Sequence, residues 1–207
     1  MNEFEQTLLT ILGQDNLNKI QRCKIGLAGA GGLGSNCARF LVCCGFKQLK
    51  IVDFDRVEYS NLNRQFYFLH QVGQLKVDAL DQNLAQINPD LKTEKLPLRI
   101  DQTNVNQLFN DCRILVEALD RPEIKRMVVE AYWDSAGLIV AASGLAGWGR
   151  GDGIVTRRIR PNFFMVGDMV SEATPDLPPL APGVNIAAAK QADVALSYVL
   201  GADVHDD

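Results

Sequence analysis

Cysteine is scarce in this sequence of 207 residues, and none follows Cys112. The total is five, two of them adjacent at positions 43 and 44. An odd number with an adjacent pair, and no secretion signal ahead of them, argues against a framework of disulfide bonds. We therefore expect a fold held by its hydrophobic core, which a chain of this length can supply.

The sequence also lacks an excess of basic charge and a long apolar run. Its 21 basic and 25 acidic residues give a net charge of −4, which argues against electrostatically driven binding to nucleic acid or an anionic membrane. No apolar stretch reaches the ~18 residues that indicate a transmembrane helix. The N-terminus is acidic and has no apolar signal core, so we expect a cytoplasmic protein.

Strand-like and helix-like segments alternate along the chain. This order predicts an α/β fold of the Rossmann-like, doubly wound type, with a mostly parallel sheet, flanking helices and an edge hairpin. Strands are expected at 24–29, 48–53, 91–98, 113–118 and 138–142, helices at 4–12, 33–44, 73–88 and 121–132, and the hairpin at 153–166. We expect one domain over 1–207, with a helical extension at 1–22, a crossing loop at 171–183 and a closing helix at 184–200.

A glycine-rich turn follows the first expected strand. It contains Gly29, Gly31, Gly32 and Gly34, and the next segment is an expected helix. Such a turn lets the backbone approach a phosphate, and the amide groups that begin the helix attract negative charge. Asp53 ends the second strand, where a carboxylate accepts hydrogen bonds from ribose hydroxyls. The pattern indicates nucleotide binding over a turn that serves packing alone, but does not choose between NAD, FAD and ATP.

Polar residues after the second strand point to a polyphosphate. Asn61 and Arg64 follow the carboxyl end of that strand, the edge where such sheets bind ligands. Lys76 falls in the first turn of the next helix, where the helix dipole disfavours a cation, and a facing phosphate would explain it. From its position alone, Lys76 is also consistent with a solvated surface lysine.

Asp120 follows the fourth strand at the same edge of the sheet. The run Asp120-Arg-Pro-Glu123 is typical of a helix N-cap with a capping box. The same carboxylate suits magnesium, which favours one or two carboxylates together with substrate phosphates.

Taken together, these motifs resemble the ubiquitin-activating-enzyme-like adenylyltransferases. The matching segments are Gly29-Ala-Gly-Gly-Leu-Gly34, Asp53-Phe-Asp, Ser60-Asn-Leu-Asn-Arg64-Gln, Gly73-Gln-Leu-Lys76 and Asp120. Within that family the chain resembles a short ThiF-type protein from about residue 24 to residue 200. The downstream lysine of the Ser-Asn-Leu-x-Arg-Gln motif favours Lys76 as a ligand.

The resemblance implies ATP-dependent adenylation of the C-terminal glycine of a small ubiquitin-like (β-grasp) carrier ending in Gly-Gly, of the ThiS-like sulfur-carrier kind used in thiamine biosynthesis. It implies Arg64 and Lys76 on the phosphates, and Asp120 on magnesium and the leaving pyrophosphate. Asn61 would hold the phosphates or metal, and Ser60 would also belong to the nucleotide site. Asp53 would bind the ribose, and Gly29, Gly31, Gly32 and Gly34 the nucleotide backbone, with Gln65 as a support behind them.

The chain departs from larger family members in three ways. It has no Cys-x-x-Cys pair, so we predict no zinc, and no late cysteine for a thioester or acyl-disulfide step. The resemblance also implies an arginine near the N-terminus that reaches across a dimer into the partner's ATP site. The first arginine here is Arg22, directly before the first expected strand, which is poorly placed for that role. A homodimer remains an expectation. The alternatives are an NAD-dependent oxidoreductase and a non-catalytic ATP-binding partner subunit. The acidic charge and short length disfavour a related tRNA-modifying branch.

Overall fold

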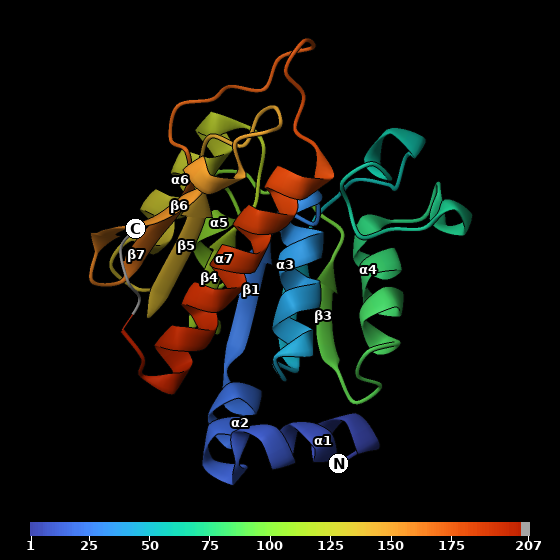
Figure 1. The fold of residues 1–207 in the computed structure, drawn as a ribbon, viewed down its shortest axis with the longest axis vertical. Coiled ribbons are helices and arrows are strands. Elements are labelled where there is room, and N and C mark those ends of the chain that lie inside the picture. The colour runs from blue at the N-terminus through green and yellow to red at the C-terminus, as the bar shows by residue number, and fades with distance from the viewer. Residues whose placement is uncertain (204–207) are drawn as a thin grey trace.

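The computed structural model describes residues 1–203 and has a seven-stranded sheet at its centre (Figure 1). The strands are β1 (Lys24–Ala28), β2 (Gln48–Val52), β3 (Lys92–Leu96), β4 (Ile114–Glu117), β5 (Leu138–Ala142), β6 (Val155–Arg160) and β7 (Phe163–Gly167). Their order is β3-β2-β1-β4-β5-β7-β6, and every neighbouring pair is parallel except β6–β7. The predicted doubly wound fold and its edge hairpin are confirmed.

Helices cover both faces of the sheet, which explains why its central strands are continuous apolar runs. On one face lie α3 (Gly32–Cys43), α4 (Lys76–Ala85) and α7 (Ala181–Leu200), and α3 packs against α7. On the other lie the short α5 (Val105–Leu108), which was not predicted, and α6 (Pro122–Tyr132). Every residue of β4 and β5 is buried between these layers, whereas the edge strand β3 is largely exposed.

Two helices, α1 (Glu3–Leu12) and α2 (Gln14–Arg22), fill the predicted extension and lie below the amino ends of the strands (Figure 1). They are fixed there by polar contacts as well as apolar ones. The Nζ of Lys47 lies 2.9 Å from the carboxylate of Glu5, which is 2% exposed, and Asn2 donates to Asn88 over 2.8 Å. This extension therefore lies at the opposite end of the sheet from the glycine turn.

Two predicted helix boundaries were wrong. Helix α4 begins at Lys76 rather than at 73, because Gly73 has φ +89° and Leu75 is still extended. Helix α7 begins at Ala181, inside the predicted crossing loop. Pro182 is compatible with that early start because the first turn of a helix does not use its N–H groups.

Short 3₁₀ turns occupy three connections: Tyr59–Asn61, Leu69–Gln71 and Gly151–Gly153. Within residues 1–203, no helix combines the length and the apolar character needed to span a membrane.

Candidate functional site

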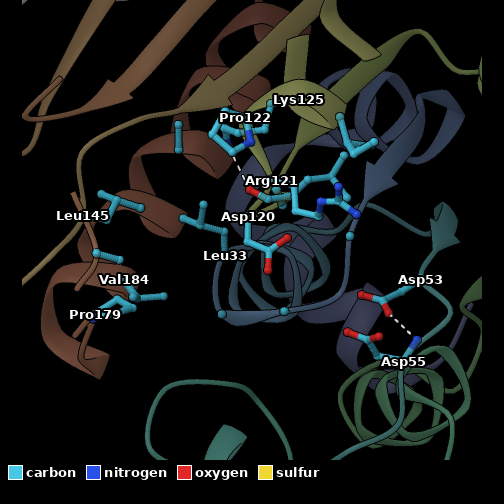
Figure 2. Close-up of a pocket in the computed structure, with 18 of the residues that line it drawn as sticks. Leu33, Asp53, Asp55, Asp120, Arg121, Pro122, Lys125, Leu145, Pro179 and Val184 are labelled. Carbon is cyan, nitrogen blue, oxygen red and sulfur yellow. Dashed lines mark hydrogen bonds between the residues drawn. The ribbon is translucent and has the colours of Figure 1, made fainter. Parts of the chain in front are cut away.

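A cavity of about 900 Å³ opens at the carboxyl ends of β1, β2, β4 and β5. The sheet order changes direction between β1 and β4, and ligands of doubly wound sheets bind at that switch point. Figure 2 shows Asp53 and Asp55 at one side of this cavity, Asp120 near its middle, and Leu145, Pro179 and Val184 at the other side. The cavity thus has an acidic corner, a central carboxylate and an apolar end.

The glycine turn forms one wall of the cavity, through Gly29, Gly31 and Gly32. Gly29 has φ +102°, and a Cβ there would lie 2.8 Å from the carbonyl oxygen of Ala118. Gly34 does not line the cavity. A Cβ on it would lie 1.9 Å from the carbonyl oxygen of Gly29. Gly34 therefore allows the close packing of α3 on the turn.

Asp53 holds the glycine turn against the end of β2. Its two carboxylate oxygens accept hydrogen bonds from the N–H groups of Ala30, at 2.7 Å, and Asp55, at 2.8 Å. Burial raises the pKa of Asp53 above its ordinary value, although the charge of Lys76 and these two N–H groups oppose the rise. Each oxygen retains a lone pair that a hydroxyl group can use.

Lys76 is not a solvated surface lysine. Its side chain is 8% exposed, and its Nζ lies 2.8 Å from a carboxylate oxygen of Asp55. It lines the cavity at the amino end of α4. An anionic ligand would compete with Asp55 for this ammonium group.

Arg64 also lines the cavity, beside Gly32. One of its guanidinium nitrogens donates to the carbonyl oxygen of Ser60 and to the Asn63 side chain, at 3.1 and 2.7 Å. The remaining guanidinium N–H groups are available to a ligand. The cationic groups of both Arg64 and Lys76 therefore belong to the lining of this cavity.

Ser60 and Asn61 lie outside the cavity lining. The Asn61 carboxamide accepts from the N–H of Glu58 at 3.0 Å and closes the 3₁₀ turn, while the Ser60 hydroxyl donates to the Glu58 carboxylate at 3.2 Å. Their polar groups shape the loop that presents Arg64.

The predicted N-cap role of Asp120 was wrong. Helix α6 has Arg121 at its N-cap position, with Pro122 in its first turn and no side-chain capping bond. Asp120 is exposed at the cavity and makes no hydrogen bond or ion pair with any described residue. Its carboxylate is therefore free to meet a ligand or a metal ion.

Sequence reasoning missed Glu117 and Lys125, which lie directly behind Asp120. Glu117 is fully buried at the end of β4, and Lys125, on α6, lines the cavity. Burial raises the pKa of Glu117, against the opposing charge of Lys125. An acidic residue in an otherwise apolar strand was the signal for this pair.

Sequence reasoning also missed the pairing of Phe54 and Arg99. Both line the cavity next to Asp53, and the Arg99 guanidinium lies 4.4 Å from the centre of the Phe54 ring.

Comparison with known proteins gives a family match over almost the whole chain: residues 4–206 match the ThiF family. The ubiquitin-like modifier-activating enzyme 5 of Arabidopsis thaliana is 42% identical over 86 residues, which are 42% of this chain and 20% of that protein. The adenylyltransferase and sulfurtransferase UBA4 of Candida glabrata is 33% identical over 128 residues, 61% of this chain and 30% of that protein. The chain spans less than a third of the length of these relatives.

A solved structure shares the fold. The tRNA N6-threonylcarbamoyladenosine dehydratase TcdA of E. coli, crystallised with ATP, superposes with a TM-score of 0.87 at 18% identity. The superposition covers 96% of this chain and 94% of that one. At this identity the likeness concerns the fold, and it agrees with the sheet order described above.

Proposed function

The chain belongs to the ThiF family, and we propose that it uses ATP to adenylate the C-terminal glycine of a small ubiquitin-like carrier protein ending in Gly-Gly. We further propose that the carrier is a ThiS-like sulfur carrier of thiamine biosynthesis, and that the enzyme is a cytoplasmic homodimer without zinc. The relatives whose names describe activating enzymes and adenylyltransferases support the reaction class.

The observation that carries the proposal is the shared cavity. Arg64 and Lys76, a free carboxylate on Asp120, and the glycine turn with Asp53 all border one space at the switch point of the sheet. A dehydrogenase needs the glycine turn and the acidic residue. The two cations and the second carboxylate are the additional groups that a triphosphate reaction uses.

We place the nucleoside beside Asp53 and Phe54, and the phosphates along the glycine turn toward Arg64 and Lys76. A carboxylate oxygen of the carrier attacks the α-phosphorus, and the bond to the oxygen that bridges to the β-phosphate breaks. The products are an acyl-adenylate and pyrophosphate. Because no proton moves in this step, the residues act by alignment and by neutralising charge.

Magnesium fits the site through Asp120, since an exposed carboxylate without a partner beside a phosphate position is the ligand that this ion prefers. When bound, the ion neutralises charge on the phosphates. Lys76 exchanges Asp55 for a phosphate oxygen, and Arg64 orients the phosphates through its free N–H groups.

The carrier tail enters from the apolar end of the cavity. Leu145, Pro179 and Val184 line that end, together with the small residues 142–144 and 146. Glycine residues suit such a passage because they carry no side chain.

The experiment that tests the proposal is exchange of labelled pyrophosphate into ATP, with and without a Gly-Gly-ended carrier and Mg²⁺. Arg64→Ala, Lys76→Met and Asp120→Ala should each lower the carrier-dependent rate by about a hundredfold, because each removes a group that faces developing charge. Matched controls are Arg126→Ala and Asp134→Ala, whose side chains are 80% and 85% exposed outside the cavity. Losses of less than tenfold for both Arg64→Ala and Asp120→Ala would contradict these roles.

A fluorescence titration with NADH, run beside the exchange assay, separates the alternatives. Tight NADH binding that ATP does not displace would indicate an oxidoreductase, and ATP binding without exchange would indicate a non-catalytic subunit. Chain length no longer disfavours a tRNA-modifying enzyme, since the superposition covers 94% of the TcdA chain. Pyrophosphate exchange that is stimulated by tRNA and not by a carrier protein would favour a tRNA-modifying enzyme over carrier adenylation.

A further inference from the structure

An ion pair with a buried carboxylate lies at the wall of the cavity. The Glu117 side chain is completely buried at the carboxyl end of β4, and the side chain of Lys125, from the first turns of α6, is 22% exposed. The Nζ of Lys125 lies 2.8 Å from one Glu117 carboxylate oxygen and 3.0 Å from the other. Figure 2 shows Lys125 above Asp120, close to Pro122.

The pair also holds both polar groups of a single residue, Leu119. The N–H of Leu119 donates to Glu117 over 2.7 Å, and its carbonyl oxygen accepts from Lys125 over 2.9 Å. The ammonium of Lys125 thus donates to one Glu117 carboxylate oxygen and to the Leu119 carbonyl, and it lies at ion-pair distance from the other carboxylate oxygen, which has no hydrogen-bond partner among the described residues.

The residue that follows Leu119 is Asp120, whose own carboxylate has no partner among residues 1–203. No side-chain contact within this part of the chain orients that carboxylate, so the backbone before Asp120 sets the direction of the Cα–Cβ bond on which it is carried. On the other side, the buried side chain of Gln191, in α7, donates to the carbonyl oxygens of Glu117 and Val140 at 3.1 and 3.3 Å. The strand end is thus fixed to α6 and to α7.

We propose that Glu117 and Lys125 are positioning residues, which fix the Leu119 peptide and thereby hold the Asp120 carboxylate toward the metal and phosphate position. The role of Asp120 itself rests on the proposed function. The role of the pair rests on the contacts above, and the two are tested separately.

The simpler alternative is that Lys125 only neutralises a buried charge. Removing Lys125 alone leaves the Glu117 carboxylate buried without an opposite charge beside it, so Lys125→Met can fail through stability. The double variant Glu117→Leu/Lys125→Met avoids this, because apolar residues of similar size often replace a buried ion pair without loss of stability. It keeps the core filled and removes both contacts to Leu119.

Two readouts other than activity test the pair. Hydrogen exchange followed in peptides covering residues 118–121 should be about tenfold faster in the double variant, with unchanged protection elsewhere. The dissociation constant of Mn²⁺ in the presence of ATP, followed by its paramagnetic resonance signal, should rise about tenfold, as expected when a residue supporting a metal ligand is lost. The single variant Lys125→Arg should keep both the hydrogen-exchange rate and the Mn²⁺ dissociation constant within about threefold of wild type, since it keeps the charge and the donors. Arg126→Met, next to it on α6, is the matched control.

The outcomes distinguish the two proposals. The positioning role is overturned if the folded double variant shows the wild-type rate of hydrogen exchange at residues 118–121. It is also overturned if hydrogen exchange there is faster but the Mn²⁺ affinity is that of wild type. Wild-type Mn²⁺ affinity in Asp120→Asn overturns the proposed role of Asp120, and hydrogen exchange in the double variant then still decides whether the pair holds the turn.

Discussion

Gly34 offers the sharpest test of how the glycine turn is built, because the obstacle to any side chain there is backbone. A Cβ at Gly34 would lie 1.9 Å from the carbonyl oxygen of Gly29 and 3.3 Å from the Cβ of Ala118. Gly29 has φ +102° and is itself close to Ala118, so the turn has little room to move away. The start of α3 must therefore shift in Gly34→Ala.

Overpacking of a well-packed site costs typically ~1–3 kcal/mol, and a clash with backbone belongs at the upper end of that range. We expect Gly34→Ala to lower the free energy of unfolding by about 3 kcal/mol, which for a chain of this size lowers Tm by roughly 6–12 °C. Urea unfolding measures the change, and an unaltered m-value would show that the same fold is being unfolded.

The matched control is Gly183→Ala in the first turn of α7, where the nearest atom to the new Cβ would be the flexible Cδ1 of Ile154 at 3.6 Å. Alanine is favoured over glycine in helices by roughly 0.5–1 kcal/mol, so this variant should be neutral or slightly stabilised. A Gly34→Ala protein within about 0.5 kcal/mol of wild type would refute the packing argument. It would also imply that the turn is softer than its contacts indicate.

Two further predictions concern charged groups. Because burial raises the pKa of Asp53, the folded protein binds a proton in a pH window where the unfolded chain does not. The difference in unfolding free energy between wild type and Asp53→Asn should therefore grow in favour of wild type as the pH falls from the raised pKa toward the ordinary value of 3.8. Urea unfolding at several pH values measures this difference. A difference that shrinks on acidification would mean that the pKa of Asp53 is depressed. At the other end of the sheet, Lys47→Met leaves the Glu5 carboxylate buried without its ion pair and should cost about 2 kcal/mol. Adding Glu5→Gln should recover most of that loss in thermal unfolding, whereas no recovery would show that Lys47 acts through packing.

The strands and the glycine turn were predictable because their signals are local. Buried parallel strands read as apolar runs, and a turn that needs a positive φ at Gly29 needs glycine. The start of α4 was missed because residues 73–75 were taken as its first turn, whereas Gly73 has a positive φ and Leu75 is extended. The capping motif at Asp120 also matched a local rule, but the backbone placed Arg121 at the cap position.

The partners behind the candidate site could not be predicted in the same way, because they join residues distant in sequence. Nothing near Asp53 indicates that its carboxylate holds the N–H of Ala30, and nothing near Glu117 indicates that Gln191 donates to its carbonyl oxygen. Such contacts depend on the packed sheet and helices. Sequence patterns therefore identified the groups that face the cavity better than the groups that hold them.

Several groups assigned to the ligand already have protein partners: Lys76 is paired with Asp55, and the Asp53 oxygens hold the turn. Because Asp55 is 46% exposed, water can take over its side of the pair when a phosphate replaces it at Lys76, so the exchange is less costly than breaking a buried pair. Asp120 has no such partner to give up among residues 1–203. A ligand at this site therefore meets one carboxylate that is ready and one cation that must be released, and the ammonium of Lys76 remains neutralised in both states.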